Sequence, residues 1–199
     1  MPQYLRQFRA PPAQPPETQT NDGLQTILTF PRALSPGQCE QLIERGEREP
    51  LASGRVNRGA SIFRDCGIAW LSPGDENPWL FEVVESLFER ASQSFSIGVQ
   101  GLHDPLQYTL YGTKQHYDWH MDIGPGPASA RKLSLSINLS DPNDYLGGAL
   151  EFAHAPGWRG DRAQGSAIVF PSFMSHRVTP VFRGARRSLV AWACGTPFR

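Results

Sequence analysis

The segment from residue 132 to 140, KLSLSINLS, alternates between apolar and polar side chains, as a strand with two different faces does. Its apolar face is formed by Leu133, Leu135, Ile137 and Leu139. From about residue 105 onward, seven short β-type runs are separated by Gly, Pro, Asn and Asp: LQYTLYG, QHYDWHM, KLSLSINLS, GALEFA, SAIVFP, SHRVTPVF and RSLVAWAC. No helical pattern lies between them, so they predict an antiparallel sandwich or barrel rather than alternating strands and helices.

Two helices are predicted ahead of this β-rich region. Residues 36 to 48 follow a capping-box signal, in which Ser35 is followed three positions later by Gln38. The pair Asn77-Pro78 repeats the start signal, and apolar residues then recur at helical spacing through WLFEVVESLFERASQSF. A first strand is expected within residues 24 to 30, LQTILTF. The pattern is that of an α+β chain with a mainly β core and flanking helices.

Length and proline content predict the domain organisation. A chain of 199 residues suffices for one sizeable core. Residues 1 to 22 contain five prolines with Gln and Thr between them, a composition typical of disorder. We therefore expect a disordered Pro-rich tail over residues 1–22 and a single domain over 23–199, with its β core at about 105–195.

Charge and cysteine content narrow the class of partner. Lys plus Arg and Asp plus Glu number 19 each, so the net charge gives no reason to expect a nucleic acid or an anionic membrane. The three cysteines are widely spaced, match neither a disulfide framework nor a zinc knuckle, and favour free thiols in a reducing compartment. No run approaches the roughly 20 apolar residues of a membrane span, and the N-terminus lacks a signal-peptide pattern. We expect a soluble, cytoplasmic protein.

The segment HYDWHMD, residues 116 to 122, contains candidate metal ligands. On a strand, residues two apart point to the same side, so His120 and Asp122 can offer a nitrogen and an oxygen to one ion. An H-x-D triplet also arises by chance on a solvated strand face. In a closed sandwich, His176 from a later β segment can supply a third ligand. Two imidazoles and a carboxylate fit a non-haem Fe(II) oxygenase, and zinc is the alternative ion, although it usually takes a tetrahedral site.

The last β segment contains a candidate carboxylate receptor. Arg186 and Ser188 are two apart and can face one interior, where a guanidinium fork beside a hydroxyl suits a carboxylate. Trp192 shares their even offset and is expected either to form a substrate wall or to pack in the core. Arg64, in the loop and strand RVNRGASIFRDCG, is a candidate substrate contact. His116 is expected to be a bystander.

These features together resemble the iron(II)- and 2-oxoglutarate-dependent dioxygenase superfamily, and within it the prolyl-4-hydroxylase-like, PKHD-type branch. The matching pieces are LQYTLYG…HYDWHMD, the apolar strand followed by GGALEF, the segment HRVTPVFRGAR before SLVAW, and the helix start LSPGQCEQLIERG. The first three extend over about residues 105 to 195. The resemblance implies a double-stranded β-helix (a jelly roll, cupin-like), with N-terminal helices packed on the major sheet.

The resemblance also implies roles for individual residues. It implies a catalytic Fe(II) site with three ligands: His120, Asp122 and His176. Arg186 would pair with the distal carboxylate of 2-oxoglutarate with the help of Ser188, Tyr111 would line the co-substrate pocket, and Tyr117 would lie nearer the substrate. The implied cofactors are Fe(II), the co-substrate 2-oxoglutarate and O2, and ascorbate is a further candidate.

The expected reaction is hydroxylation of an aliphatic C–H bond, with a peptidyl residue such as proline as the leading substrate. The alternative is hydroxylation of a free amino acid or another small metabolite, so the expected partner is a peptide, a protein or a small molecule. Nucleic-acid demethylation is disfavoured because Trp192 stands where that branch carries an arginine. A non-oxidative β-sandwich that binds a metal or a sugar is disfavoured because it has no need of Arg186 and Ser188.

Overall fold

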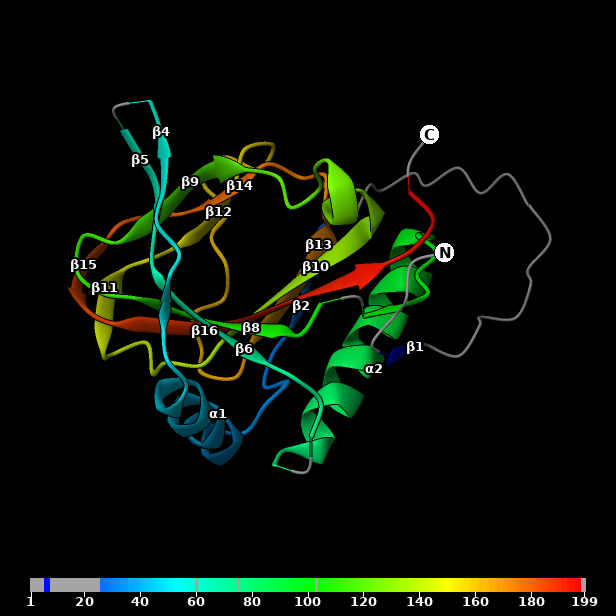
Figure 1. Cartoon of the computed structure of the whole chain (residues 1–199), viewed down its shortest axis with the longest axis horizontal. Coiled ribbons are helices and arrows are strands. Elements are labelled where there is room, and N and C mark those ends of the chain that lie inside the picture. The colour runs from blue at the N-terminus through cyan, green and yellow to red at the C-terminus, as the bar shows by residue number, and fades with distance from the viewer. Residues whose placement is uncertain (1–5, 8–25, 60, 75, 103, 198–199) are drawn as a thin grey trace.

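A computed structural model describes residues 6–7, 26–59, 61–74, 76–102 and 104–197 (Figure 1). Within this part of the chain, the largest element is a nine-stranded sheet. Its strands are β1 (Arg6–Gln7), β2 (Leu28–Phe30), β3 (Ala52–Ser53), β6 (Gly67–Leu71), β7 (Gly101–Leu102), β8 (Leu106–Tyr111), β10 (Arg131–Asn138), β13 (Ala167–Pro171) and β16 (Arg186–Cys194). Strands β13, β10, β16 and β8 are neighbours in that order at its centre, and all of their pairings are antiparallel.

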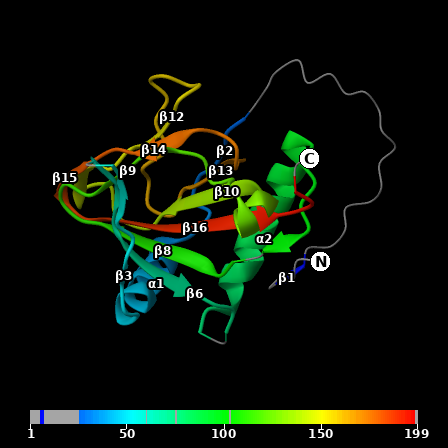
Figure 2. The ribbon, with the colours of Figure 1, turned by 45° about the horizontal axis from the view of Figure 1, so that its top comes forward.

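A smaller, five-stranded sheet lies over one face of the nine-stranded sheet (Figure 2). Its strands, in spatial order, are β12 (Leu150–Phe152), β14 (His176–Val178), β9 (His116–His120), β5 (Ser61–Asp65) and β4 (Val56–Arg58). A two-stranded ribbon of β11 (Tyr145–Gly147) and β15 (Val181–Gly184) completes the β structure of the described residues. The hairpin of β4 and β5, cyan in Figure 1, extends beyond the rest of the molecule at the upper left. The chain is therefore mainly β, as the sequence predicted.

Two helices lie on the other face of the nine-stranded sheet (Figure 2): α1 (Pro36–Arg48) and α2 (Pro78–Phe95). A short 3-10 helix, η1 (Gly126–Ala130), precedes β10. Buried side chains of both helices, such as Leu42 and Phe88, belong to one apolar cluster with Leu133, Leu135 and Ile137 of β10. A second cluster, which includes Phe152 and Phe170, lies between the two sheets.

The strand β10 shows why its alternation matters for the site. Its apolar face packs in the cluster with the helices, whereas its polar face is turned toward the smaller sheet, where Ser136 lines a cavity. Ser134 and Asn138 of this polar face are buried. The polar half of the alternation therefore faces a polar interior and not solvent.

The helix starts follow two different patterns. Helix α1 begins as predicted, because the Ser35 hydroxyl accepts from the Gln38 backbone N–H and the Gln38 side chain accepts from the Ser35 N–H. Helix α2 also begins at the predicted residue, but the Asn77 side chain makes no capping bond. Its oxygen accepts a hydrogen bond from Arg45 of α1 instead. A tertiary contact has replaced the local one.

Several other predictions bear on the ends of the chain and its cysteines. Arg6–Gln7 pair with β7, and the other residues of the predicted tail over 1–22 lie outside the described part of the chain. The first strand covers Leu28–Phe30, and residues 24–25 of the predicted run also lie outside it. All three cysteines are buried and form no disulfide, as expected. No helix in the described residues has the length and apolar character needed to cross a membrane, and the cytoplasmic location stays a prediction.

Candidate active site

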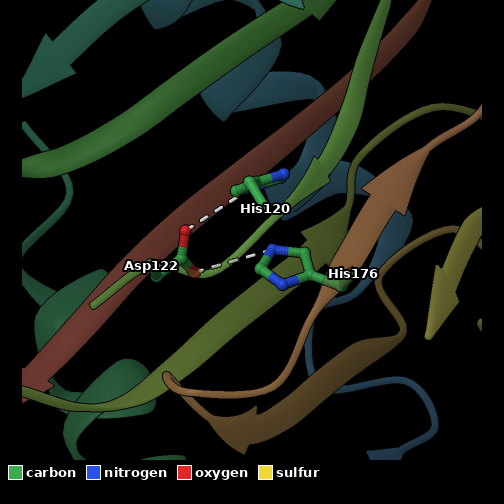
Figure 3. Close-up of side chains that lie close together, drawn as sticks. All are labelled: His120, Asp122 and His176. Atoms are coloured by element: carbon green, nitrogen blue, oxygen red, sulfur yellow. Dashed lines mark ion pairs between the residues drawn. The ribbon is translucent and has the colours of Figure 1, made fainter. Parts of the chain in front are cut away.

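Three side chains from two neighbouring strands of the smaller sheet and the residues that follow one of them converge at one point (Figure 3). His120 ends β9, Asp122 follows it two residues later, and His176 opens β14 directly opposite His120 in the antiparallel register. His120 Nε2 lies 3.6 Å from Asp122 Oδ1, and His176 Nε2 lies 3.7 Å from Asp122 Oδ2. One ligand atom from each residue lies within 4.8 Å of the others. This spacing suits three ligands of a single ion.

Hydrogen bonds fix the orientation of each candidate ligand. His120 Nδ1 lies 2.7 Å from the Asp118 carbonyl, and His176 Nδ1 lies 2.9 Å from the Met174 carbonyl. A carbonyl accepts only, so each bond requires a proton on Nδ1 and leaves the Nε2 lone pair free for a metal. The Ser134 hydroxyl donates to Asp122 Oδ2 over 2.6 Å and lies 3.0 Å from the Ser172 hydroxyl.

The electrostatics of the site favour the metal-binding protonation states. Burial, and after it the nearby His176, lower the pKa of His120 to about 4 against the attraction of Asp122. Burial raises the pKa of the Asp122 carboxyl, but His176, His120 and the Ser134 hydroxyl outweigh that effect and the pKa is lowered overall. At neutral pH the site therefore offers a neutral His120 imidazole and a carboxylate, which are the forms that bind a metal ion.

A buried guanidinium lies in the same cavity as the triad. Arg186 at the start of β16 is 5% exposed, and its Nη1 donates to the Ser188 hydroxyl over 3.3 Å. Tyr111 is paired with Arg186 in the register of β8 and β16, and its ring centroid lies 5.9 Å from the guanidinium carbon. No acidic residue in the described part of the chain forms an ion pair with Arg186. An unpaired buried charge is costly, so this position calls for an anionic ligand.

The cavity has a volume of about 230 Å³ and also contains the three side chains that sequence considerations assigned to the substrate. The Tyr117 ring stacks on His120 with centroids 3.4 Å apart, and the Arg64 guanidinium lies 4.7 Å from the Tyr117 centroid. Trp192 is 6% exposed and lines the same cavity. His116 does not line it, and its Nε2 lies 3.1 Å from the Ile62 carbonyl.

Comparisons with known proteins identify the family. Residues 106–194 match the model of a protein family described as the 2OG-Fe(II) oxygenase superfamily. A PKHD-type hydroxylase of Azoarcus sp. (strain BH72) is 41% identical over 168 residues, which cover 80% of this chain and 74% of that protein. The chain belongs to the 2OG-Fe(II) oxygenases. A PKHD-type hydroxylase of Xylella fastidiosa (strain 9a5c) is 35% identical over 180 residues, covering 83% of this chain and 77% of the relative, so the chain falls in the PKHD-type branch.

Solved structures support the same fold for this 2OG-Fe(II) oxygenase. A prolyl-4-hydroxylase of Pseudomonas putida has a TM-score of 0.70 at 22% identity and covers 86% of this chain and 93% of its own. A prolyl hydroxylase of Trichoplax adhaerens, in complex with a hypoxia-inducible factor peptide fragment, has a TM-score of 0.68 at 17% identity and covers 86% and 84%. The two facing sheets are therefore the jelly roll of these oxygenases.

As a member of this family, the protein is a 2-oxoglutarate-dependent dioxygenase and a hydroxylase, and its cofactors are Fe(II), 2-oxoglutarate and O2. The residues present fit these groups. The two Nε2 atoms and the Asp122 carboxylate suit Fe(II), and the unpaired Arg186 beside Ser188 suits a carboxylate. Family membership rules out the non-oxidative sandwich.

Sequence reasoning assigned no role at the oxygenase site to Arg131, Ser134 or Gln107, and it expected Trp70 only to pack in the core or at the rim. Arg131 lies 3.7 Å above the Trp192 ring and pairs with Asp104 at 2.7 Å. Trp70 of β6 is 46% exposed at the edge of the cavity, with its ring 6.3 Å from that of Trp192. Ser134 binds Asp122, and Gln107 lines the cavity. The signal for Ser134 was its even offset on an alternating strand, and Gln107 likewise lies at an even offset from Tyr111 on β8. No local signal marked Arg131 or Trp70.

Proposed function

We propose that this oxygenase hydroxylates an aliphatic C–H bond of a peptidyl residue, with proline as the leading candidate. The observation that carries the proposal is that the His120, Asp122 and His176 triad shares one cavity with the buried, unpaired Arg186. A metal site alone would serve many functions. A metal site with a carboxylate receptor in the same small cavity suits the use of an oxo acid as co-substrate.

In this proposal, His120, Asp122 and His176 hold Fe(II), whereas Arg186, Ser188 and Tyr111 receive the distal carboxylate of 2-oxoglutarate. Fe(II), 2-oxoglutarate and O2 together supply the oxidation, in which one oxygen atom enters succinate, carbon dioxide is released and the other oxygen atom forms the hydroxyl of the product. The hydrogen bonds of the two Nδ1 atoms and of the Ser134 hydroxyl orient the three ligands. Arg186 fixes the co-substrate with charge-assisted hydrogen bonds, and the buried Tyr111 closes that end of the cavity against water.

Tyr117, Trp192 and Arg64 form the substrate side of the proposed site. Tyr117 lies against His120, so a group placed beside its ring lies next to the metal. The names of the similar proteins support a prolyl substrate, because one is a prolyl-4-hydroxylase and another holds a peptide fragment. We expect the target side chain to enter the cavity while the remainder of the peptide stays outside, beside the exposed Trp70.

The cavity volume is equally compatible with a second candidate, a free amino acid or another small metabolite. Pockets that enclose a whole drug-sized ligand measure about 300–1,000 Å³, and this cavity is smaller, at about 230 Å³. It therefore suits one side chain of a peptide or one small molecule. A screen of both peptides and free amino acids for hydroxylation separates these two candidates.

Anaerobic reconstitution with Fe(II), followed by 2-oxoglutarate and O2, tests the proposal. Succinate is measured, and peptides and free amino acids are screened by mass spectrometry for the gain of one oxygen atom. We expect Asp122→Ala and His176→Ala to form no succinate. His116→Ala is the matched control, because His116 lies on the same strand as His120 but outside the cavity. Unchanged succinate formation in Asp122→Ala would contradict the metal assignment. Comparing the rate of succinate formation with and without ascorbate tests whether ascorbate is a further cofactor.

A further inference from the structure

Arg64 is a second guanidinium in the cavity that lacks an acidic partner among the described residues. It is half-buried on β5, and its Nε donates to Cys66 Sγ over 3.2 Å. Burial raises the pKa of the Cys66 thiol, so at neutral pH the thiol does not neutralise the guanidinium. The adjacent Asp65 accepts a hydrogen bond from Gln115 instead. The positive charge of Arg64 is therefore left without compensation from the chain.

The formal charges of the site with Fe(II) and 2-oxoglutarate bound also leave the positive charge of Arg64 unmatched. The charged residues that line the cavity in the described chain are Asp122, Arg64, Arg131 and Arg186. Asp104 neutralises Arg131 through their ion pair. The two charges of Fe(II) are matched by the two carboxylates of 2-oxoglutarate, and Asp122 is matched by Arg186. Arg64 is the one charge that remains, and a half-buried charge without a counter-ion favours the binding of an anion.

The position of Arg64 relates it to the substrate side of the metal. The Arg64 guanidinium lies 4.7 Å from the Tyr117 ring, and the Tyr117 ring is stacked on the His120 imidazole. In the sheet, Arg64 is also the register partner of Tyr117 between β5 and β9. An anion bound by Arg64 therefore lies one aromatic ring away from a proposed iron ligand. A carbon attached to that anion can reach the metal while the anion itself stays at the edge of the site.

We propose that Arg64 binds a carboxylate of the substrate. The substrate class is then an anionic, carboxylate-bearing molecule: either a free amino acid or a peptide with an acidic residue next to the hydroxylated one. The guanidinium fork, with its remaining N–H groups, matches a carboxylate in geometry as well as in charge. This inference rests on the proposed function, because the charge comparison assumes that Fe(II) and 2-oxoglutarate occupy the same cavity.

Binding to the loaded protein tests the inference without turnover. The full chain is saturated with Mn(II) and 2-oxoglutarate under nitrogen, and ligands are added in matched pairs while calorimetry measures Kd. The pairs are acetate and acetamide, L-proline and L-prolinamide, and the capped peptides Gly-Pro-Glu and Gly-Pro-Gln. At least one carboxylate should bind about 10- to 100-fold more tightly than its amide, as expected for a charge-assisted hydrogen bond. Preference within the proline pair indicates a free amino acid, and preference within the peptide pair indicates an acidic peptide.

Arg64→Gln should abolish the preference, and Arg64→Lys should keep part of it because the charge remains. The matched control is Arg58→Gln, which removes an exposed arginine of the same hairpin that lies over Phe63 and outside the cavity. The inference is overturned if no carboxylate binds more tightly than its amide, or if the preference survives Arg64→Gln. It is also overturned if Arg64→Gln weakens 2-oxoglutarate binding instead, because Arg64 would then serve the co-substrate. Failure of the wild-type protein to bind 2-oxoglutarate with Mn(II) would instead contradict the proposed function itself.

Discussion

Ser134→Ala removes the hydroxyl that holds the proposed metal-binding carboxylate. Ser134 Oγ donates to Asp122 Oδ2 over 2.6 Å, and Ser134 is fully buried, so water does not readily replace it. A hydrogen bond to a charged group contributes about 1.5–3 kcal/mol. Loss of a residue that hydrogen-bonds to a metal ligand typically lowers metal affinity about 10- to 100-fold. Because about 1.4 kcal/mol corresponds to a tenfold change in affinity, this range agrees with the energy of the hydrogen bond. We therefore expect the Kd for the metal to rise about 10- to 100-fold.

Calorimetry with Mn(II), under nitrogen and without 2-oxoglutarate, measures this Kd directly. Ser136→Ala is the matched control, because Ser136 lies two residues further along the same strand face but makes no hydrogen bond to a proposed ligand. Ser172 Oγ lies 3.0 Å from Ser134 Oγ, so the double variant Ser134→Ala, Ser172→Ala excludes replacement by the neighbouring hydroxyl. An Mn(II) Kd equal to that of the wild type in the double variant would refute the role of Ser134.

Three further predictions concern charge, space and pH. Arg186→Met removes a buried charge without an acidic partner, so the Tm of the metal-free protein should not fall while calorimetric binding of 2-oxoglutarate with Mn(II) is lost; retained binding would contradict the assignment. Gly148→Ala, at φ +60°, places a Cβ 3.0 Å from Arg186 Cδ and should weaken 2-oxoglutarate binding, whereas Gly157→Ala, at φ +85° with open space around it, should lower stability by about 1 kcal/mol without that effect. The pKa of His120 is about 4 in the folded protein and about 6.5 in the unfolded chain, so the unfolded chain binds more protons between these values. The free energy of unfolding of the metal-free protein should therefore fall as the pH is lowered from about 6.5 to 4. Urea titrations at several pH values measure this free energy for the wild type and for His120→Asn. If the free energy of unfolding falls with pH equally steeply in both proteins, His120 is not the cause.

Local periodicity explains why the residue set of the site could be predicted from sequence. Arg186, Ser188 and Trp192 are related by even offsets on β16, and on a strand that relation places side chains on one face. His120 and Asp122 are also two apart, although Asp122 lies just beyond the end of β9. All five line the same cavity.

The capping box of α1 could also be predicted from a local pattern, because its two hydrogen bonds join residues only three positions apart.

The remainder of the site depends on which strands become neighbours, and no local pattern contains that information. The polar face of β10 reads as solvated in sequence, yet Ser134 is buried because the smaller sheet covers that face. Arg131 follows a Gly- and Pro-rich segment, and its pairing with Asp104 and stacking on Trp192 depend on segments far apart in sequence. Asn77 has the sequence of a helix cap, but a long-range bond from Arg45 takes its side chain.

The residues proposed for the chemistry of this oxygenase and those proposed for its selectivity lie partly in different regions of the chain. The family match covers residues 106–194, which include the triad and Arg186, whereas Arg64 and Trp70 lie outside it on β5 and β6. Because β5 is hydrogen-bonded to β9, a side chain of the hairpin is held beside the strand that contains His120 without taking part in metal binding. Substitutions in β5 can therefore change which substrate binds while leaving the iron and co-substrate residues in place. The proposed carboxylate contact of Arg64 therefore lies on a strand outside the matched region that contains the metal and co-substrate residues.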